Sequence, residues 1–216
     1  MTSLTKPALK SVEIHCSMSL ENTICLLLER NTAPEQPIRY TGSISIKNII
    51  KDVEVTMPNQ VWVSDTAYIR TVKGFCYLAL VTDMYSRKIV GYGLSDSLEL
   101  KGCVRALNKA LYQSKDVKKL IHRSDRGIQY CSNQYTQVLK RNKIDIGMTE
   151  ENHCCENALA ERVNGILKDE FYLDQTFTDK VHAKRATKNA INLYNEIRLH
   201  LSLDHKTPNM VYLKTA

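Results

Sequence analysis

The chain has 216 residues and a formal net charge of +7, and 43% of its residues are hydrophobic. A chain of this length can bury a sizeable core, and the composition is ordinary for a globular protein, which excludes global disorder. The longest strongly apolar run, residues 75–81, is far shorter than the roughly 20 residues that span a bilayer, and the sequence does not open with a typical signal peptide. The seven cysteines include no CxxC pair. We therefore expect a reduced, cytoplasmic protein without a disulfide framework.

The positive charge is confined to one part of the chain. Residues 1–57 carry six basic and six acidic side chains, whereas residues 58–216 carry 24 basic and 17 acidic side chains. Residues 1–57 also show weak periodicity, and we expect them to form an irregular N-terminal arm, or the remnant of a larger domain. The basic excess after residue 57 favours a polyanionic partner, although simple solubility also explains it.

A regular pattern begins after Pro58 and Asn59, a pair typical of a turn. The strands expected from alternation or from apolar runs cover residues 61–69, 75–82, 89–94, 119–123 and 144–148. The expected helices are one capped by Ser97 and running to Leu111, one that follows Ser132, and two over residues 156–170 and 179–200. The order βββαβαβαα predicts an α/β fold in which a meander of three strands precedes αβ units.

Three carboxylates occupy positions that a purely structural role explains poorly. Asp65 continues the face of the first strand that Val61 and Val63 begin, where a charge is costly unless it is paired or binds a metal. Asp125 directly follows a strand, and open α/β sheets bind ligands at the carboxyl ends of their strands. Glu161 lies on the polar stripe of a predicted amphipathic helix. Each has an ordinary alternative, because aspartates often form turns or caps and helical glutamates are usually solvent-exposed.

The spacing of these carboxylates, with 35 residues between Asp125 and Glu161, resembles the DDE signature of retroviral-type integrases and bacterial transposases. The flanking segments are similar to the integrase core of second-frame (orfB-like) insertion-sequence transposases. They comprise residues 61–66, 80–91, 122–130 and 156–165, followed by Tyr194, Asn195, Arg198, His200, Thr207 and Pro208. The resemblance covers about residues 58–213. It implies an RNase H-like fold, in which a mixed five-stranded sheet is flanked by helices.

The resemblance also implies a function, that of a transposase catalysing metal-dependent DNA strand cleavage and strand transfer. Asp65, Asp125 and Glu161 would be its catalytic residues and would bind Mg²⁺, for which Mn²⁺ can substitute, because these ions prefer hard oxygen ligands. The implied partners are DNA (transposon ends and target), further copies of the chain in a synaptic complex, and the first-frame DNA-binding protein of the same element. The implied location is the bacterial cytoplasm, at the nucleoid.

Basic and polar side chains near these carboxylates are expected to contact DNA. Lys168 lies seven residues after Glu161 on the same helix face, and an ordinary exposed lysine is its alternative. The other expected contacts are Arg126, Asn157 and the row of Lys180, Lys184 and Lys188, for which a solvated helix face is an equally good explanation. His122, just before Asp125, is expected to be a packed histidine rather than a metal ligand.

Two departures from the family leave a second function open. Cys155 stands where these transposases usually have tyrosine, and residues 1–57 hardly resemble the helical region that usually recognises DNA ends. The alternative is therefore a truncated, catalytically idle DNA-binding remnant. An RNase H-type nuclease would share the carboxylates, but it would not explain Trp62 or the segment at residues 194–208.

Overall fold

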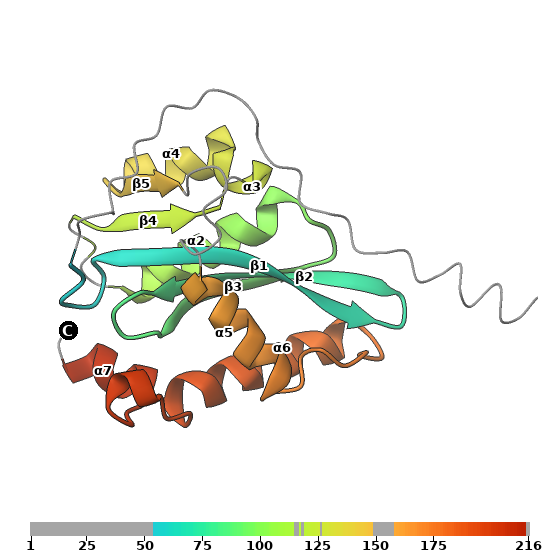
Figure 1. The fold of residues 1–216 in the computed structure, drawn as a ribbon. Helices are drawn as coiled ribbons and strands as arrows, with labels where there is room; N and C mark the ends of the chain where they lie inside the picture. Colours follow the sequence, from blue (N-terminus) through green and yellow to red (C-terminus); the bar gives the residue numbers. More distant parts are fainter. Residues whose placement is uncertain (1–53, 115–116, 118, 126, 149–157, 215–216) are drawn as a thin grey trace, which may run out of the picture. The chain divides into compact units, whose positions relative to one another are not determined.

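The computed structural model describes residues 54–114, 117, 119–125, 127–148 and 158–214. The predicted N-terminal arm therefore lies almost entirely outside the described residues. Within them, the strands are β1 (Val61–Thr71), β2 (Gly74–Asp83), β3 (Ile89–Ser95), β4 (Ile121–Ser124) and β5 (Asp145–Met148). They form one sheet in the order β3-β2-β1-β4-β5 (Figure 1). The first three strands pair antiparallel, whereas β4 pairs parallel with β1 and with β5, so the predicted mixed five-stranded sheet is confirmed.

Helices cover both faces of this sheet (Figure 1). One face packs against α2 (Leu100–Gln113), α3 (Ile128–Cys131) and α4 (Asn133–Arg141), and the other against α5 (Ala158–Asp169) and α6 (Lys180–Glu196). A 3₁₀ turn, η2 (Leu201–Leu203), then leads to α7 (Pro208–Lys214). The four predicted helices are confirmed with shifted ends. The short α3 and α7 were not predicted, because so few residues carry too little periodicity. No helix in the described ranges is long and apolar enough to span a membrane.

The interior strand β2, which lies between β3 and β1, contributes to the core on both faces of the sheet. Leu78 and Leu80 pack in the cluster with α5 and α6, whereas Ala79 and Val81 pack in the cluster with α2. Successive side chains of a strand point to opposite faces, so a strand covered on both sides needs an uninterrupted apolar run. The run in residues 75–82 thus correctly predicted this position in the fold.

Helix α2 lies directly against the backbone of β3. A Cβ atom at Gly91 would stand 2.1 Å from the carbonyl oxygen of Ala106, so glycine is required for this close approach. The predicted cap at Ser97 is wrong, because α2 begins at Leu100 after an N-cap at Glu99. The Ser97 carbonyl instead accepts a hydrogen bond from Ser95 Oγ (2.8 Å), which places Ser97 in the turn that leaves β3.

The closing segment fastens the helical layer to the edge strand β3. The side-chain amide of Asn195 accepts from the Ile89 N–H (2.9 Å) and donates to the Ile89 carbonyl (3.0 Å), so it satisfies both backbone groups of a residue that has no further strand beside it. The hydroxyl of Tyr194 donates to the carbonyl of Arg87 in the β2–β3 turn (3.1 Å). Tyr194 and Asn195, which belong to the segments similar to the integrase core, therefore have a structural role, because they attach α6 to the β2–β3 turn and to β3.

Candidate active site

Asp65 and Asp125 come together because of strand register. Strands β1 and β4 run parallel, and the last residues that they pair are Ser64 and Ser124. Asp65 and Asp125 each follow one of these serines, so both carboxylates lie one residue beyond the end of the pairing. Asp65 is held there because β1 continues beside β2, whereas Asp125 begins the turn towards α3. The pair thus occupies the carboxyl end of a parallel strand pair, where open α/β sheets bind ligands.

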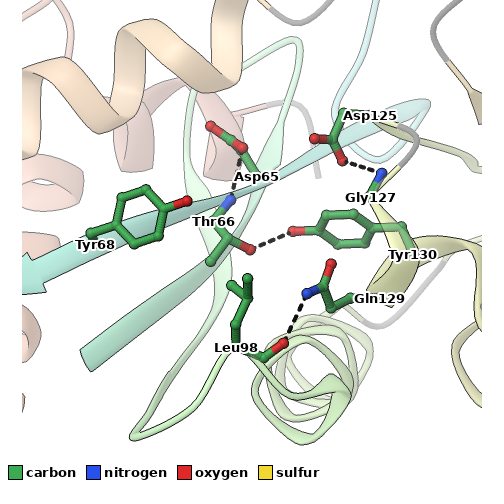
Figure 2. A pocket seen from close by; sticks show the side chains of 8 residues that line it. All are labelled: Asp65, Thr66, Tyr68, Leu98, Asp125, Gly127, Gln129 and Tyr130. Atoms are coloured by element: carbon green, nitrogen blue, oxygen red, sulfur yellow. Dashed lines mark hydrogen bonds between the residues drawn. The ribbon is translucent and has the colours of Figure 1, made fainter. Parts of the chain in front are cut away.

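Both aspartates line one small pocket, shown in Figure 2 with their carboxyl groups at the same end. Its walls are Asp65, Thr66, Tyr68, Leu98, Asp125, Gly127, Gln129 and Tyr130. The Thr66 N–H donates to Asp65 Oδ1 (2.8 Å) and the Gly127 N–H to Asp125 Oδ1 (3.0 Å). The hydroxyls of Thr66 and Tyr130 are 3.1 Å apart. The two backbone N–H donors thus orient the two carboxylates.

Glu161 approaches the same place from helix α5. It lies exposed in the first turn, and one turn later Asn164 Nδ2 donates to Asp65 Oδ2 (2.7 Å), which ties the helix to the strand. The negative charge of Glu161 acts on Asp65 and raises its pKa. Among the described residues, no three histidine, cysteine, aspartate or glutamate side chains stand together closely enough to hold one ion. The carboxylates are therefore neighbours without forming a closed metal cage.

Asp65 is electrostatically unusual. Its pKa is raised from 3.8 to about 6, chiefly because burial disfavours the charged form, with smaller contributions from the charges of Asp125 and Glu161. The hydrogen bonds from Thr66 and Asn164 lower it, but not enough to compensate. Without a bound cation, the site therefore contains more negative charge than its surroundings stabilise, as is common at functional sites.

The prediction that His122 is packed in the core is confirmed. Its side chain is fully buried, and Nε2 lies 2.8 Å from Ser64 Oγ and 2.9 Å from the hydroxyl of Tyr135. Burial lowers the pKa of His122 to about 3, so the ring is neutral at physiological pH. Ser64 is also only 1% exposed. This serine–histidine pair therefore supports the strand ends behind the aspartates and cannot reach a substrate.

The predicted DNA contacts lie in different surroundings. Lys168 is partly buried in the last turn of α5, and Lys184 and Lys188 are exposed on α6. Lys180 forms an ion pair with Asp96, which follows β3, so its charge is already partly compensated. Arg126 and Asn157 lie outside the described residues, as does Cys155.

Sequence reasoning missed Asn164 and Tyr130 as members of the site. Asn164 belongs to the same polar helix stripe as Glu161, and a polar residue one turn after a candidate catalytic residue was the available signal. Tyr130 had no such signal, because its place beside Thr66 depends on how α3 turns back after Asp125.

Comparison with protein families agrees with this geometry. One integrase core domain model matches residues 55–154 and a second matches residues 142–208. The transposase of insertion sequence element IS904 from Lactococcus lactis is 33% identical over 172 residues, which are 79% of this chain and 68% of that protein. The IS629 transposase of Shigella sonnei is 33% identical over 70% of this chain and 51% of its own length. The InsF transposase of IS3A from Escherichia coli is 34% identical over 76% of this chain and 58% of its own length.

Solved structures show the same fold at lower identity. The catalytic core of HTLV-2 integrase, in complex with magnesium, has a TM-score of 0.58 and 19% identity, covering 72% of this chain and 97% of that one. The simian T-cell lymphotropic virus intasome has a TM-score of 0.62 and 19% identity, covering 92% of this chain and 68% of that one. The RNase H-like fold is thus confirmed. The chain spans only about half to two thirds of the length of the curated relatives. It belongs to the insertion-sequence transposases that carry an integrase core domain.

Proposed function

We propose that this protein is a DDE transposase that cleaves DNA strands and joins them to new DNA, with Asp65, Asp125 and Glu161 as its catalytic residues. The observation that supports this most is the pocket at the end of the β1–β4 pair, which contains both aspartates. The bond from Asn164 to Asp65 holds the helix of Glu161 beside that pocket. Three carboxylates in one region, on a chain of the transposase family, support the assignment of strand transfer.

The donor chemistry of the site fits divalent cations. Carboxylate oxygens are preferred by Mg²⁺ and Mn²⁺. Burial, with smaller contributions from Asp125 and Glu161, raises the pKa of Asp65, and a bound cation would favour its charged form. Asp65, Asp125 and Glu161 would hold such ions. When bound, they would stabilise negative charge on the attacking and leaving oxygens of an in-line phosphoryl displacement.

The residues of the chain have separate tasks in this proposal. The Thr66 N–H and Asn164 Nδ2 each bind one oxygen of Asp65, which fixes the carboxylate and leaves further lone pairs directed to the pocket. The Gly127 N–H does the same for Asp125. Ser64 and Ser124 are each only 1% exposed, so neither would serve as a nucleophile. In this proposal water or a DNA 3′-hydroxyl would attack instead, without a covalent protein–DNA intermediate.

DNA and protein partners complete the proposal. Lys168, Lys184 and Lys188 would contact DNA phosphates, as would Arg126 and Asn157, whereas Lys180 would first have to leave Asp96. We further propose a homo-oligomer in a synaptic complex and a first-frame partner protein, acting at the nucleoid. The intasome and the dimeric and trimeric integrase cores, which share the fold, support the oligomer.

A cleavage and strand-joining assay on labelled DNA ends tests the function. We expect nicked and joined products with Mg²⁺ or Mn²⁺, and none when chelator is added. Asp125→Asn should abolish both products, whereas Asp145→Asn, an exposed aspartate at the start of β5, should leave them unchanged. Products that persist in Asp125→Asn would refute the catalytic assignment. A wild type that binds DNA but never cleaves it would favour the idle DNA-binding alternative.

A further inference from the structure

Three arginines from separate parts of the chain gather around the end of α6. Arg87 lies in the β2–β3 turn, and its carbonyl accepts the hydrogen bond from Tyr194. Arg198 lies two residues after the end of α6, and its Nε and second terminal nitrogen bind the carboxylate of Glu170 (2.6 and 2.5 Å). Glu170 continues α5, because its N–H bonds to the carbonyl of Ile166. Arg162 lies two turns earlier in that helix. Three chain segments thus contribute one arginine each.

Electrostatic effects agree with this placement. Arg198, Arg87 and Arg162 all lower the pKa of His200, whose ring packs edge-on against Tyr194 with centroids 5.1 Å apart. Burial and these charges lower the pKa of His200 to about 4, so this histidine is neutral at physiological pH. The positive charge of the cluster therefore comes from the arginines alone.

The carboxylates near the cluster, Glu170 and Asp83, compensate only part of this charge. Glu170 is bound to Arg198, whose side chain is only 18% exposed. Asp83, which Arg87 also influences, is fully buried and accepts hydrogen bonds from the N–H and hydroxyl of Ser86 and from the N–H of Asn59. Within the described part of the chain, the guanidinium groups of Arg87 and Arg162 form neither an ion pair nor a hydrogen bond. Two guanidinium groups thus remain available to an anion.

We infer that Arg87, Arg162 and Arg198 form a phosphate-binding site that holds the DNA backbone beside the reacting bond. The planar guanidinium fork matches phosphate oxygens. Arg198 is already ordered by Glu170, which partly compensates its charge, so it contributes less to anion binding than the two other arginines. Arg87 and Arg162 make the direct contacts. This inference rests on the proposed transposase function. It specifies in addition which phosphates of the DNA the protein binds.

The positions of Arg162 and Glu170 along α5 limit the distance between the proposed phosphate-binding site and the candidate catalytic residue Glu161. Arg162 follows Glu161 directly, and Glu170 lies nine residues after Glu161, a helical rise of about 13 Å. This length corresponds to about four base pairs of duplex at about 3.4 Å each. The contacted phosphates therefore lie within about four base pairs of the bond that reacts.

Binding of a labelled duplex without divalent metal tests the site independently of catalysis. We expect Arg162→Gln and Arg87→Gln each to reduce the slope of log Kd against log salt by about 1, and the double variant by about 2. Each lost contact should weaken binding about fivefold at about 0.15 M salt. The matched control is Arg141→Gln, an exposed arginine in the last turn of α4, which should leave the slope unchanged.

A second measurement does not depend on how the variants fold. Neutral methylphosphonates, placed one at a time in the duplex, should weaken wild-type binding about fivefold only within about four base pairs of the reacting bond. The double variant should not distinguish these duplexes from unmodified DNA. Equal losses in Arg162→Gln and Arg141→Gln, or a uniform methylphosphonate effect, would overturn the site even if the wild type cleaves DNA. A wild type that does not bind DNA at all would overturn both this site and the proposed function.

Discussion

In the metal-free protein, the Asp65 carboxyl should make folding stability depend on pH in the direction opposite to that of an ordinary aspartate. The pKa of Asp65 is about 6 in the folded protein, and we take its ordinary value of 3.8 for the unfolded chain. Between these two pH values the folded protein therefore binds more protons than the unfolded one. Stability contributed by the protonated carboxyl is present below pH 3.8 and is lost as the pH rises through 6. One pKa unit corresponds to about 1.4 kcal/mol. The loss should therefore reach about 2–3 kcal/mol, allowing for the partial exposure of Asp65.

Unfolding by denaturant at a series of pH values, without metal, measures this effect. Subtracting the free energy of unfolding of Asp65→Asn from that of the wild type removes the contributions of other groups, such as His122. The difference should fall by about 2–3 kcal/mol between pH 3.5 and 7, which corresponds to about 4–12 °C in melting temperature for a chain of this size. Parallel pH curves for the two proteins would refute the reasoning.

Divalent cations should offset the loss of stability that ionisation of Asp65 causes as the pH rises. An ion that binds the ionised carboxylate at about 100 times its dissociation constant stabilises the folded state by about 2.7 kcal/mol. We expect a larger rise in melting temperature with Mg²⁺ or Mn²⁺ at pH 7.5 than at pH 5, where protons compete for Asp65. Asp65→Asn should lose most of the rise at pH 7.5. Equal rises in both proteins would show that Asp65 is not a ligand.

Three further predictions follow from single contacts. Asn164→Ala removes the donor to Asp65 Oδ2, so the pKa of Asp65 should rise further and strand transfer should slow; a carboxyl titration by NMR that gives an unchanged pKa would contradict this. Gly91→Ala should lower the free energy of unfolding by at least about 1–3 kcal/mol through its clash with Ala106, whereas Gly165→Ala, in open space on α5, should raise it by about 0.5–1 kcal/mol. Because the pKa of His122 is lowered from 6.5 to about 3, acidification from pH 6.5 to 5 should cost the wild type about 2 kcal/mol that His122→Gln does not lose, as measured by denaturant unfolding.

Much of the fold could be predicted because its signals are local. The alternation in β1 and the unbroken apolar run in β2 are determined by which faces are covered, and they are visible in a few consecutive residues. The helical stripe of α5 shows its buried and polar sides in the same way. Where two local signals competed, as at Ser97 and Glu99, the sequence could not decide the start of the helix, since the turn after β3 uses the Ser97 carbonyl.

The candidate carboxylates were also predictable from the sequence, but their arrangement was not. The spacing from Asp125 to Glu161 indicated a family, whereas the register that ends at Ser64 and Ser124 decides that Asp65 and Asp125 share a pocket. The bond from Asn164 to Asp65 joins residues 99 positions apart. No local pattern encodes such a pair, because it depends on how α5 packs across the finished sheet.

For the surface charges, too, the sequence determined one part and the tertiary structure another. The sequence by itself determined that the basic excess follows residue 57, since a count of side chains is enough. Only the tertiary structure decided that Lys180 pairs with Asp96, and that the charges of Arg87, Arg162 and Arg198 all act on His200. Whether the charge of a side chain is compensated depends on its neighbours in space. The packing of α5 and α6 and the contact of Tyr194 with the β2–β3 turn determine those neighbours.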